Sequence, residues 1–196
     1  MNFYNNEFIF YIRLNLPKKA FASETDKHHL ISAVCSLKKD FGLHIYGLVI
    51  LDDALLSIAG FRTAGIHEIH ACLYSLLMRY REGVSIYPGD ENVYTIQTAR
   101  RAAICRLEND RDVIDALRYI HLIPLSEGYV ESAFEYWWSS FANYRNQYYR
   151  DVIDSETILG RLSTDGSRAR QSFIAYHRKK EREGNPVPEC LREYTA

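Results

Sequence analysis

The sequence predicts an α+β fold of the ferredoxin-like kind, in which an antiparallel sheet carries helices packed on one face and a helical C-terminal tail follows. The first observation is the order of the apolar patterns, which is strand, helix, strand, strand, helix, strand and then helices. The second is that no Gly-rich turn follows a strand pattern, which excludes a dinucleotide-binding or P-loop fold. The length of 196 residues fits one domain with a tail.

The N-terminal segment predicts a strand followed by a helix. Residues 7–14 are rich in aromatic and β-branched side chains, which favour a strand. Residues 23–40 carry apolar side chains at helical spacing. Ser23 or Thr25 can cap the start of this helix, and Gly42 suits its end because glycine readily adopts the left-handed conformation found there.

An acidic pair, Asp52 and Asp53, interrupts the next apolar stretch. Residues 43–51 and 54–59 therefore predict either two strands joined by a tight turn or one strand with a bulge. Residues 66–80 follow as the clearest amphipathic helix, because their apolar side chains recur at i, i+3, i+7, i+10, i+11 and i+14.

The second half of the chain predicts mainly helices. One begins near Asn109 or Asp110 and is ended by Pro124, whose ring disfavours a helical residue before it. Another covers residues 167–183, with Ser167 as its cap.

A segment of high aromatic density lies between these helices. Residues 129–149 hold nine aromatic side chains, which could stack on unpaired bases but more often form core. We expect a packing role for them. The predicted organisation is an α+β domain over residues 1–150 and a helical tail over 151–196, packed on the domain or extending from it.

Composition excludes several classes of protein. Lys and Arg number 24 against 25 Asp and Glu, so any nucleic-acid site must be a local positive patch. The four cysteines are scattered without a C-x-x-C pair, which favours reduced thiols over disulfides or a cysteine zinc site. No apolar run is long enough to span a bilayer, and no signal-peptide pattern is present. We expect a soluble, cytoplasmic protein without a membrane partner.

Two segments carry a more specific pattern. Residues 115–130 read DALRYIHLIPLSEGYV, and residues 136–141 read YWWSSF. They resemble the signature of the REP-associated tyrosine transposases, a group of single-tyrosine (HUH) transposases, in which L-R-Y-I-H-x-N-P-V-x-A-G-L-V is followed by Y-x-W-S-S-Y. Residues 41–49 resemble the family strand that leads into its histidine motif. The resemblance covers most of the chain in layout and is specific at 115–141.

The resemblance implies a particular chemistry. In the family, two histidines one residue apart share a strand face and hold a divalent metal, Mg²⁺ or Mn²⁺, which polarises a phosphate of single-stranded DNA. A tyrosine on a nearby helix attacks the phosphorus and forms a covalent phosphotyrosine link. Carried over by position, this nucleophile is Tyr119. His121 belongs to the same motif and is expected to orient a phosphate.

This chain departs from the family at the metal site. The family pattern M-P-N-H-x-H-L-L aligns with residues 49–56, so Asp52 replaces the first histidine and Ala54 the second. Asp52 is the one metal ligand that this alignment offers, because a carboxylate binds Mg²⁺ and a methyl group does not. If the strand is regular, Asp52 and Ala54 share one face. We therefore expect strand cleavage to be impaired or lost.

Basic side chains supply the candidate DNA contacts. Residues 161–182 hold seven Lys and Arg against two acidic residues, and a local patch of this kind suits phosphate contacts. The DNA-binding residues that we expect are Arg100, Arg101, Arg106, Arg118, Arg168, Arg170, Arg178, Lys179 and Lys180.

The leading hypothesis is therefore a transposase-like protein that binds hairpin or single-stranded DNA, with little or no strand cleavage. One alternative is a nonenzymatic interaction module, in which the apolar helix 66–80 serves a partner or a homodimer interface. The absence of a continuous positive surface from Arg100 and Arg101 to residues 168–180 would favour this module. The other alternative is an active metal-dependent transposase, in which Asp52 or Asp53 joins His121 or another distant residue in a rebuilt metal site.

Overall fold

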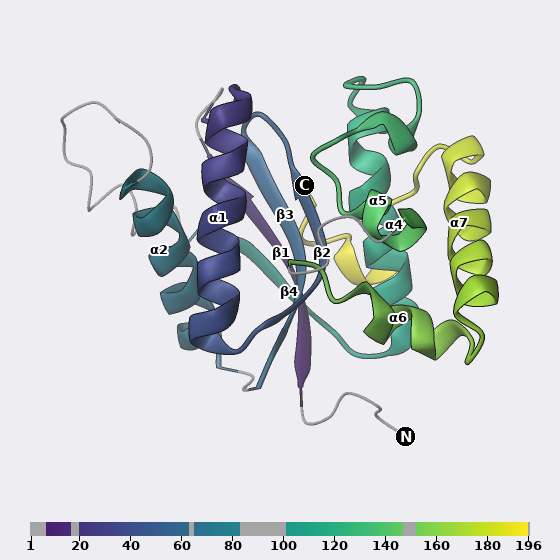
Figure 1. Ribbon diagram of the computed structural model, residues 1–196, viewed down its shortest axis with the longest axis horizontal. Coiled ribbons are helices and arrows are strands. Elements are labelled where there is room, and N and C mark those ends of the chain that lie inside the picture. Colours follow the sequence, from purple (N-terminus) through teal and green to yellow (C-terminus); the bar gives the residue numbers. More distant parts are fainter. Residues whose placement is uncertain (1–6, 17–19, 63–64, 83–100, 147–151, 196) are drawn as a thin grey trace.

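A single antiparallel sheet organises the computed structural model (Figure 1). Its strands are β1 (Phe8–Asn15), β2 (His44–Ile50), β3 (Ala54–Phe61) and β4 (Ala103–Leu107), in the order β2-β3-β1-β4. Helix α1 (Glu24–Phe41) connects β1 to β2, and α2 (Ile66–Glu82) lies between β3 and β4 in the chain. This is the ferredoxin-like topology that the sequence predicts. The structure describes residues 7–16, 20–62, 65–82, 101–146 and 152–195.

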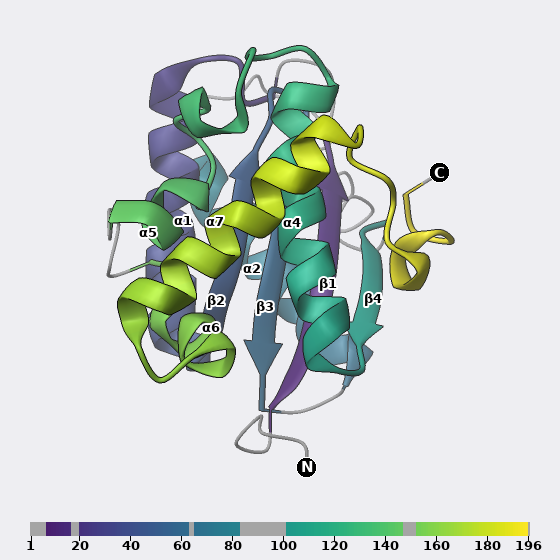
Figure 2. The same cartoon turned by 90° about the vertical axis from the view of Figure 1, so that its right-hand side faces the viewer.

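Helices cover both faces of the sheet. Helices α1 and α2 pack on one face, as predicted, and the later helices lie on the opposite face (Figures 1 and 2). These are α4 (Asp110–Ser126), α5 (Phe141–Asn146), α6 (Ser155–Leu162) and α7 (Gly166–Arg182), with short 3₁₀ turns η1 (Ala133–Glu135) and η2 (Glu189–Leu191). Coverage of both faces explains why β2 and β3 are almost continuously apolar and buried rather than alternating.

Local capping signals set most of the helix boundaries. The Ser23 hydroxyl accepts a hydrogen bond from the Asp26 amide at the start of α1, and Gly42 ends that helix at a φ of 59°. The Asn109 side chain accepts from the Asp112 amide at the start of α4. These three residues were predicted as helix ends.

Two boundaries differ from the prediction. Helix α4 continues through Pro124 to Ser126, so Pro124 does not end it. The proline lies in the last turn, where few bonds remain to be lost, and the Glu127 amide still donates to the Ile123 carbonyl. Helix α7 is capped by Asp165, whose carboxylate accepts from the amide of Ser167, so Ser167 lies inside the first turn.

The apolar stripe of α2 is used within the chain. Five of its six predicted members are buried, namely Ile69, Leu73, Leu76, Leu77 and Tyr80. Ile66 is the exposed member, at 43%. The Tyr80 hydroxyl also donates to the Ala20 carbonyl at 2.7 Å. Most of the stripe therefore packs against its own domain, which leaves little of it exposed for the partner or homodimer surface of the interaction-module alternative.

The aromatic segment has mainly a packing role, as expected. Tyr136, Phe141 and Tyr144 are buried, whereas Trp137 remains 60% exposed. The Tyr136 hydroxyl donates to the Ile50 carbonyl at 2.7 Å, which ties the segment to the end of β2.

A bulge and a glycine position α4 on the sheet. Ile45 pairs with Ala59 and Gly47 with Ile58, so Tyr46 is an extra residue in β2. Its carbonyl accepts a hydrogen bond from the hydroxyl of Tyr144 in α5 at 2.6 Å. This bond satisfies a backbone group that the bulge removes from the ladder.

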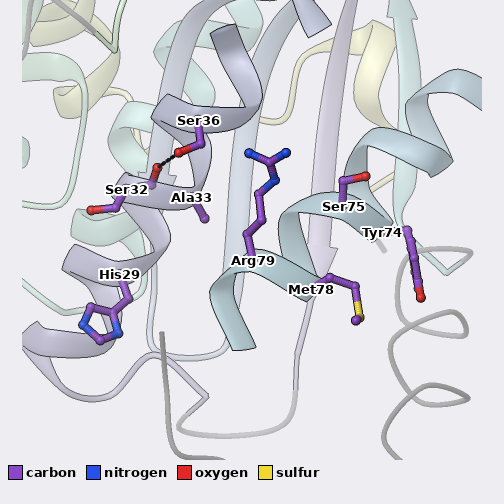
Figure 3. A pocket seen from close by; sticks show the side chains of 8 residues that line it. All are labelled: His29, Ser32, Ala33, Ser36, Tyr74, Ser75, Met78 and Arg79. Atoms are coloured by element: carbon purple, nitrogen blue, oxygen red, sulfur yellow. Dashed lines mark hydrogen bonds between the residues drawn. The ribbon is translucent and has the colours of Figure 1, made fainter. Parts of the chain in front are cut away.

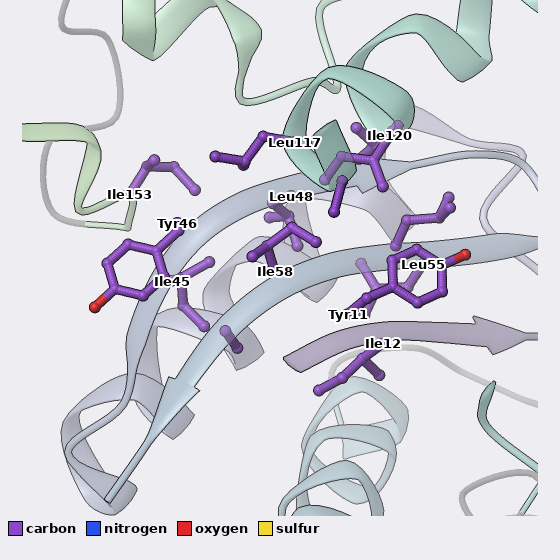
Figure 4. Packing of buried hydrophobic residues seen from close by; sticks show 14 of the residues in the cluster. Tyr11, Ile12, Ile45, Tyr46, Leu48, Leu55, Ile58, Leu117, Ile120 and Ile153 are labelled. Atoms are coloured by element: carbon purple, nitrogen blue, oxygen red, sulfur yellow. The ribbon is translucent and has the colours of Figure 1, made fainter. Parts of the chain in front are cut away.

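Next to the bulge, Gly47 allows α4 to approach closely. A Cβ atom at Gly47 would lie 2.5 Å from Cδ2 of Leu117 and 2.9 Å from Cδ1 of Ile120. Figure 4 shows these two α4 side chains pointing toward the strands beside Ile58. The register of α4 is therefore set at this contact, which in turn places Tyr119.

The C-terminal tail packs on the domain instead of extending from it. Helix α7 lies against α4 and α5, and α6 lies against β2. The boundary predicted at residue 150 falls outside the described residues. None of the four cysteines forms a disulfide. Among the described helices, none combines the length and the apolar character needed to cross a membrane.

Candidate functional site

Tyr119 lies on α4 over the face of the sheet that carries Arg13. Ile58 of β3 lies beside Leu117 of α4 at the Gly47 contact, so the Ile58 side chain points to the α4 side of the sheet. Tyr11 of β1 is the direct pairing partner of Ile58. Since side chains on one strand share a face at every second residue, Arg13 points to the α4 side as well. Tyr119 is 8% exposed.

Burial dominates the chemistry of the Tyr119 hydroxyl. It raises the pKa of Tyr119, and the positive charge of Arg13 and a hydrogen bond with the Thr195 side chain oppose this rise in part. The negative charge of Glu127 adds to the rise. The phenol is therefore protonated at neutral pH and would need to lose its proton before it could attack phosphorus.

Position 54 lies on the face of the sheet that α4 covers. Ala54 opens β3 and pairs with Asn15, and Leu56 pairs with Arg13, so positions 54 and 56 face α4. A histidine at position 54 would thus belong to the same face as Tyr119. This chain has a methyl group there, which offers no ligand atom.

Asp52 does not share that face, contrary to the expectation for a regular strand. The strand β2 ends at Ile50, and Asp52 lies in the turn before β3, where the alternation of faces does not apply. Its Oδ1 atom is 2.8 Å from Nζ of Lys27, which belongs to α1 on the opposite face of the sheet.

The residues present do not fit the metal centre that the family resemblance implies. The Asp52 carboxylate is engaged by Lys27, and the Lys27 ammonium also lies 6.0 Å from the Tyr136 ring and 5.8 Å from the Trp138 ring. Across the described ranges, no three His, Cys, Asp or Glu side chains gather in a way that could hold a metal ion.

Asp52→Asn is expected to lower the free energy of unfolding by about 1–2 kcal/mol, equally with and without Mn²⁺. The Lys27 side chain is only 8% exposed, so its charge would lose its carboxylate partner in a poorly hydrated place. The partial exposure of Asp52 keeps the effect below that of a fully buried pair. Urea unfolding measures it, with Asp53→Asn as the matched control. A loss that appears only when Mn²⁺ is present would instead identify Asp52 as a ligand.

His121 is fully buried and faces away from Tyr119. Its Nδ1 atom is 3.1 Å from Nε2 of His177 in α7, and its Nε2 atom is 2.8 Å from the Ser140 hydroxyl. The ring stacks on Phe141 at 5.3 Å. Residues two apart on a helix point in nearly opposite directions, so His121 and Tyr119 cannot bind the same phosphate. The prediction that His121 orients a phosphate is wrong for this structure.

The partners of the two histidines fix their tautomers. The Phe173 carbonyl can only accept, so Nδ1 of His177 carries a proton and its Nε2 accepts from Nδ1 of His121. Nε2 of His121 then accepts from the Ser140 hydroxyl, which itself accepts from the Leu48 amide at 2.9 Å. Desolvation lowers the pKa of His121 well below its usual value and that of His177 to about 3. Both rings are neutral and structural.

Arg118 is also part of the interior. It is 2% exposed, and its Nη1 atom donates to the Asn185 side chain at 2.7 Å and to the Pro186 carbonyl at 2.8 Å. Arg118 thus fastens the segment after α7 to α4. The prediction that it contacts DNA is wrong for this structure.

The remaining predicted DNA contacts divide by exposure. Arg101, Arg106, Arg168, Arg178 and Lys179 are exposed.

Arg170 and Lys180 are half-buried and form ion pairs with Glu156 and Glu183. Arg100 lies outside the described residues. In both views α4 lies between β4, which follows Arg101, and α7 (Figures 1 and 2). Arg101 and the exposed cations of α7 thus lie on elements that α4 separates in these views.

Sequence reasoning missed two residues beside Tyr119, Arg13 and Glu127. The signal for Arg13 was a lone positive charge in the strand pattern EFIFYIRL. The signal for Glu127 was a charged residue where the family pattern A-G has alanine. Burial raises the pKa of Glu127, and the positive charge of Arg13 opposes that rise.

Two hollows border these elements. One, of about 620 Å³, lies at the β4 edge of the sheet and is lined by β1 and β4 residues, Arg101, the C-terminal segment, and Ile66 and His70 of α2. Thr195 connects it with Tyr119. The other, of about 550 Å³, lies between α1 and α2 and is lined by serines, His29 and Arg79 (Figure 3). Because the second hollow is on the face opposite α4, it has no connection with Tyr119.

Comparison with known proteins supports the fold assignment. No protein-family model matches the chain. No curated protein sequence matches it either. Among solved structures, the chain is similar to a REP-associated tyrosine transposase bound to a REP hairpin, with a TM-score of 0.54 and 18% sequence identity. The match covers 76% of this chain and 87% of that one. At this identity the likeness establishes a shared fold.

Proposed function

We propose that this protein is a transposase-like DNA-binding protein that recognises hairpin or single-stranded DNA and has impaired or lost tyrosine-dependent cleavage. The observation that carries the proposal is the position of Tyr119. It lies in the family motif, on a helix that covers the sheet face of position 54, within a fold shared with a hairpin-bound transposase. This position of Tyr119 supports the arrangement of the family, in which a tyrosine lies beside the metal-binding strand.

The loss of cleavage follows from the same geometry. Ala54 supplies no ligand atom, and the Asp52 carboxylate pairs with Lys27. The Tyr119 phenol has a raised pKa, and its nearest charge of useful sign is the fixed guanidinium of Arg13. The site therefore retains a place for a phosphate and lacks the two-histidine centre that would activate it.

DNA recognition would use exposed cations at two places. Arg168, Arg178 and Lys179 lie along α7, and Arg101 lies beside β4. Each cation that contacts a phosphate releases counterions on binding, so the affinity should fall steeply as salt rises. The net charge of −1 makes this dependence a property of local patches.

Incubation with a labelled DNA hairpin that carries a single-stranded flank is expected to give salt-sensitive binding and no covalent product. A gel shift at two salt concentrations, with and without Mg²⁺ and Mn²⁺, measures binding, and a denaturing gel of the same samples detects a covalent adduct. Arg168→Ala with Arg178→Ala should weaken binding about tenfold or more, by loss of phosphate contacts. Lys39→Ala is the matched control, because Lys39 is exposed on α1, on the face of the sheet opposite α4 and α7.

Two results would contradict the proposal in different ways. A covalent band that disappears in Tyr119→Phe would show that cleavage survives and that a metal site is rebuilt from other residues. Absence of binding at low salt would remove the nucleic-acid function and leave the interaction module.

A further inference from the structure

We propose that Arg13, with Arg101, binds a phosphate of the single-stranded part of the DNA beside Tyr119, and that this binding needs no divalent metal. The inference rests on the proposed function and names the ligand chemistry of the site. In this proposal the Arg13 guanidinium lies next to Tyr119 and to position 54, where the family has a histidine and this chain has Ala54.

The first argument is the position of Arg13 in the sheet. Asn15 pairs with Ala54, and Arg13 lies two residues before Asn15 on the same face of the adjacent strand. Arg13 is thus a diagonal neighbour of the position that lacks its histidine. Its charge reaches Tyr119 closely enough to oppose the rise in that residue's pKa.

The second argument is the state of the Arg13 side chain. Its Nε atom donates to the Asn15 side chain at 2.9 Å, which orients the guanidinium. Among the described residues, no carboxylate lies within the 4.0 Å of an ion pair with Arg13, although Glu127 is near enough to sense its charge. The fork of N–H groups is therefore held in place without an acidic partner, which suits bidentate binding of an anion.

Arg13 and Arg101 line the same hollow at the β4 edge of the sheet. Arg13, Asn15, Arg101 and Thr195 line a space of about 620 Å³, together with one carboxylate, that of Glu193. This space is large enough for a nucleotide-sized group, and it opens where β4 begins. Two guanidiniums and the Thr195 hydroxyl offer donors to a phosphate, and the single acid limits the site's net positive charge.

A buried hydroxyl lies next to Arg13. Tyr11 is fully buried, and among the described residues no group meets its hydroxyl in ordinary hydrogen-bond geometry. The Arg13 side chain is the group placed to bond it, and the charge of Tyr119 also acts on it, so the three side chains are neighbours. A buried hydroxyl without a partner is costly, and an anion or its bound water at Arg13 would supply one.

The alternative anion, a free phosphate or sulfate, shares the same chemistry with a DNA phosphate. The position of Arg13 beside Tyr119 favours the DNA phosphate. Under the proposed function, a DNA strand passes Tyr119. A metal would make the site's affinity depend on chelators, whereas an arginine makes it independent of them.

The test compares the flanked hairpin with the same hairpin lacking its flank, in EDTA. Arg13→Gln should weaken binding of the flanked hairpin about tenfold and leave the blunt hairpin within about twofold, since a charge-assisted bidentate contact is worth about that much. Arg13→Lys should fall between wild type and Arg13→Gln, because it keeps the charge and loses the fork. Arg79→Gln is the matched control, because Arg79 belongs to α2, on the face of the sheet opposite α4, and pairs with Asp40. Thermal unfolding of each variant checks that it folds.

The outcomes separate this inference from the proposed function. Equal binding of the flanked hairpin by wild type and Arg13→Gln, or binding that EDTA abolishes and Mn²⁺ restores, overturns the inference while DNA binding stands. If no DNA binds, the proposed function fails, and a titration with inorganic phosphate then decides the site. Shifts of the Arg13 and Arg101 side-chain N–H signals in NMR would support an anion site, and unchanged signals would overturn it.

Discussion

Acidification from pH 7 to pH 4.5 is expected to lower the free energy of unfolding by about 3 kcal/mol through His177 alone. The pKa of His177 is about 3 in the folded protein and about 6.5 in the unfolded chain. Between these values the unfolded chain binds the proton and the folded protein does not. The contribution of His177 to stability is therefore fully present above pH 6.5. Below that pH, the free energy of unfolding falls by about 1.4 kcal/mol per pH unit as the pH decreases toward 3.

His121 adds to this loss in the same direction, because burial also lowers its pKa well below 6.5. The Phe173 and Leu117 carbonyls favour a proton on His177, but desolvation outweighs them and the positive charge of Arg118 also opposes it. At His121, the Ser140 hydroxyl donates to the ring. The pair joins α4 to α7, so protonation should first separate α7 from the rest of the fold.

Urea unfolding at pH 7 and at pH 4.5 tests this expectation. The double variant His121→Phe with His177→Phe removes both titrating groups and suits the ring-lined site, so it should remain near wild-type stability at pH 7 and lose most of the acid effect. His177→Phe alone should cost about 1–3 kcal/mol at pH 7, because it leaves an N–H of His121 buried without an acceptor. The control His67→Gln changes an exposed helix residue.

A double variant that keeps the full acid sensitivity would show that the histidine pair is not its source. The carboxylates in ion pairs, such as Asp154 with Lys38, would then be the next groups to examine.

The contrast between local and distant partners explains what the sequence could predict. The strand and helix periods, and caps such as Ser23 and Asn109, are signals within a few residues, and they predicted the order of elements and hence the ferredoxin-like topology. The motif at 115–130 predicted which helix carries Tyr119. The boundary errors at Pro124 and Ser167 arose because a helix can tolerate proline in its last turn and can take its cap from the preceding residue.

The roles of the polar side chains could not be predicted in the same way, because their partners are far away in the sequence. His121 meets His177 at a separation of 56 residues, and Arg118 meets Asn185 at a separation of 67.

Asp52 meets Lys27 across 25 residues, at a turn that redirects its side chain from the face we expected. In each case the observed role is packing or pairing with a partner that the local sequence does not indicate. Arg13 shows the reverse, because only the sheet register brings it beside position 54.

Gly47→Val is expected to lower the free energy of unfolding by about 3 kcal/mol or more and to displace α4, and with it Tyr119. The added side chain would occupy the space now filled by Leu117 and Ile120, whose tips would lie 2.5 and 2.9 Å from the new Cβ. Overpacking of a core contact typically costs about 1–3 kcal/mol, and the branched γ-carbons of valine extend the overlap. The bulge at Tyr46 next to it leaves the strand little freedom to move away.

Gly160 offers a matched control for the effect of glycine itself. A Cβ at Gly160, in α6, would meet no atom within 4 Å, so Gly160→Ala should raise the free energy of unfolding by about 0.5–1 kcal/mol. Gly47→Ala should instead lower it. Combining Gly47→Ala with Leu117→Ala should then cost less than the sum of the two single changes, because each removes part of the other's conflict. If the two costs simply add, or if Gly47→Val is as stable as wild type, α4 is not seated at Gly47, and the placement of Tyr119 over position 54 loses its structural basis.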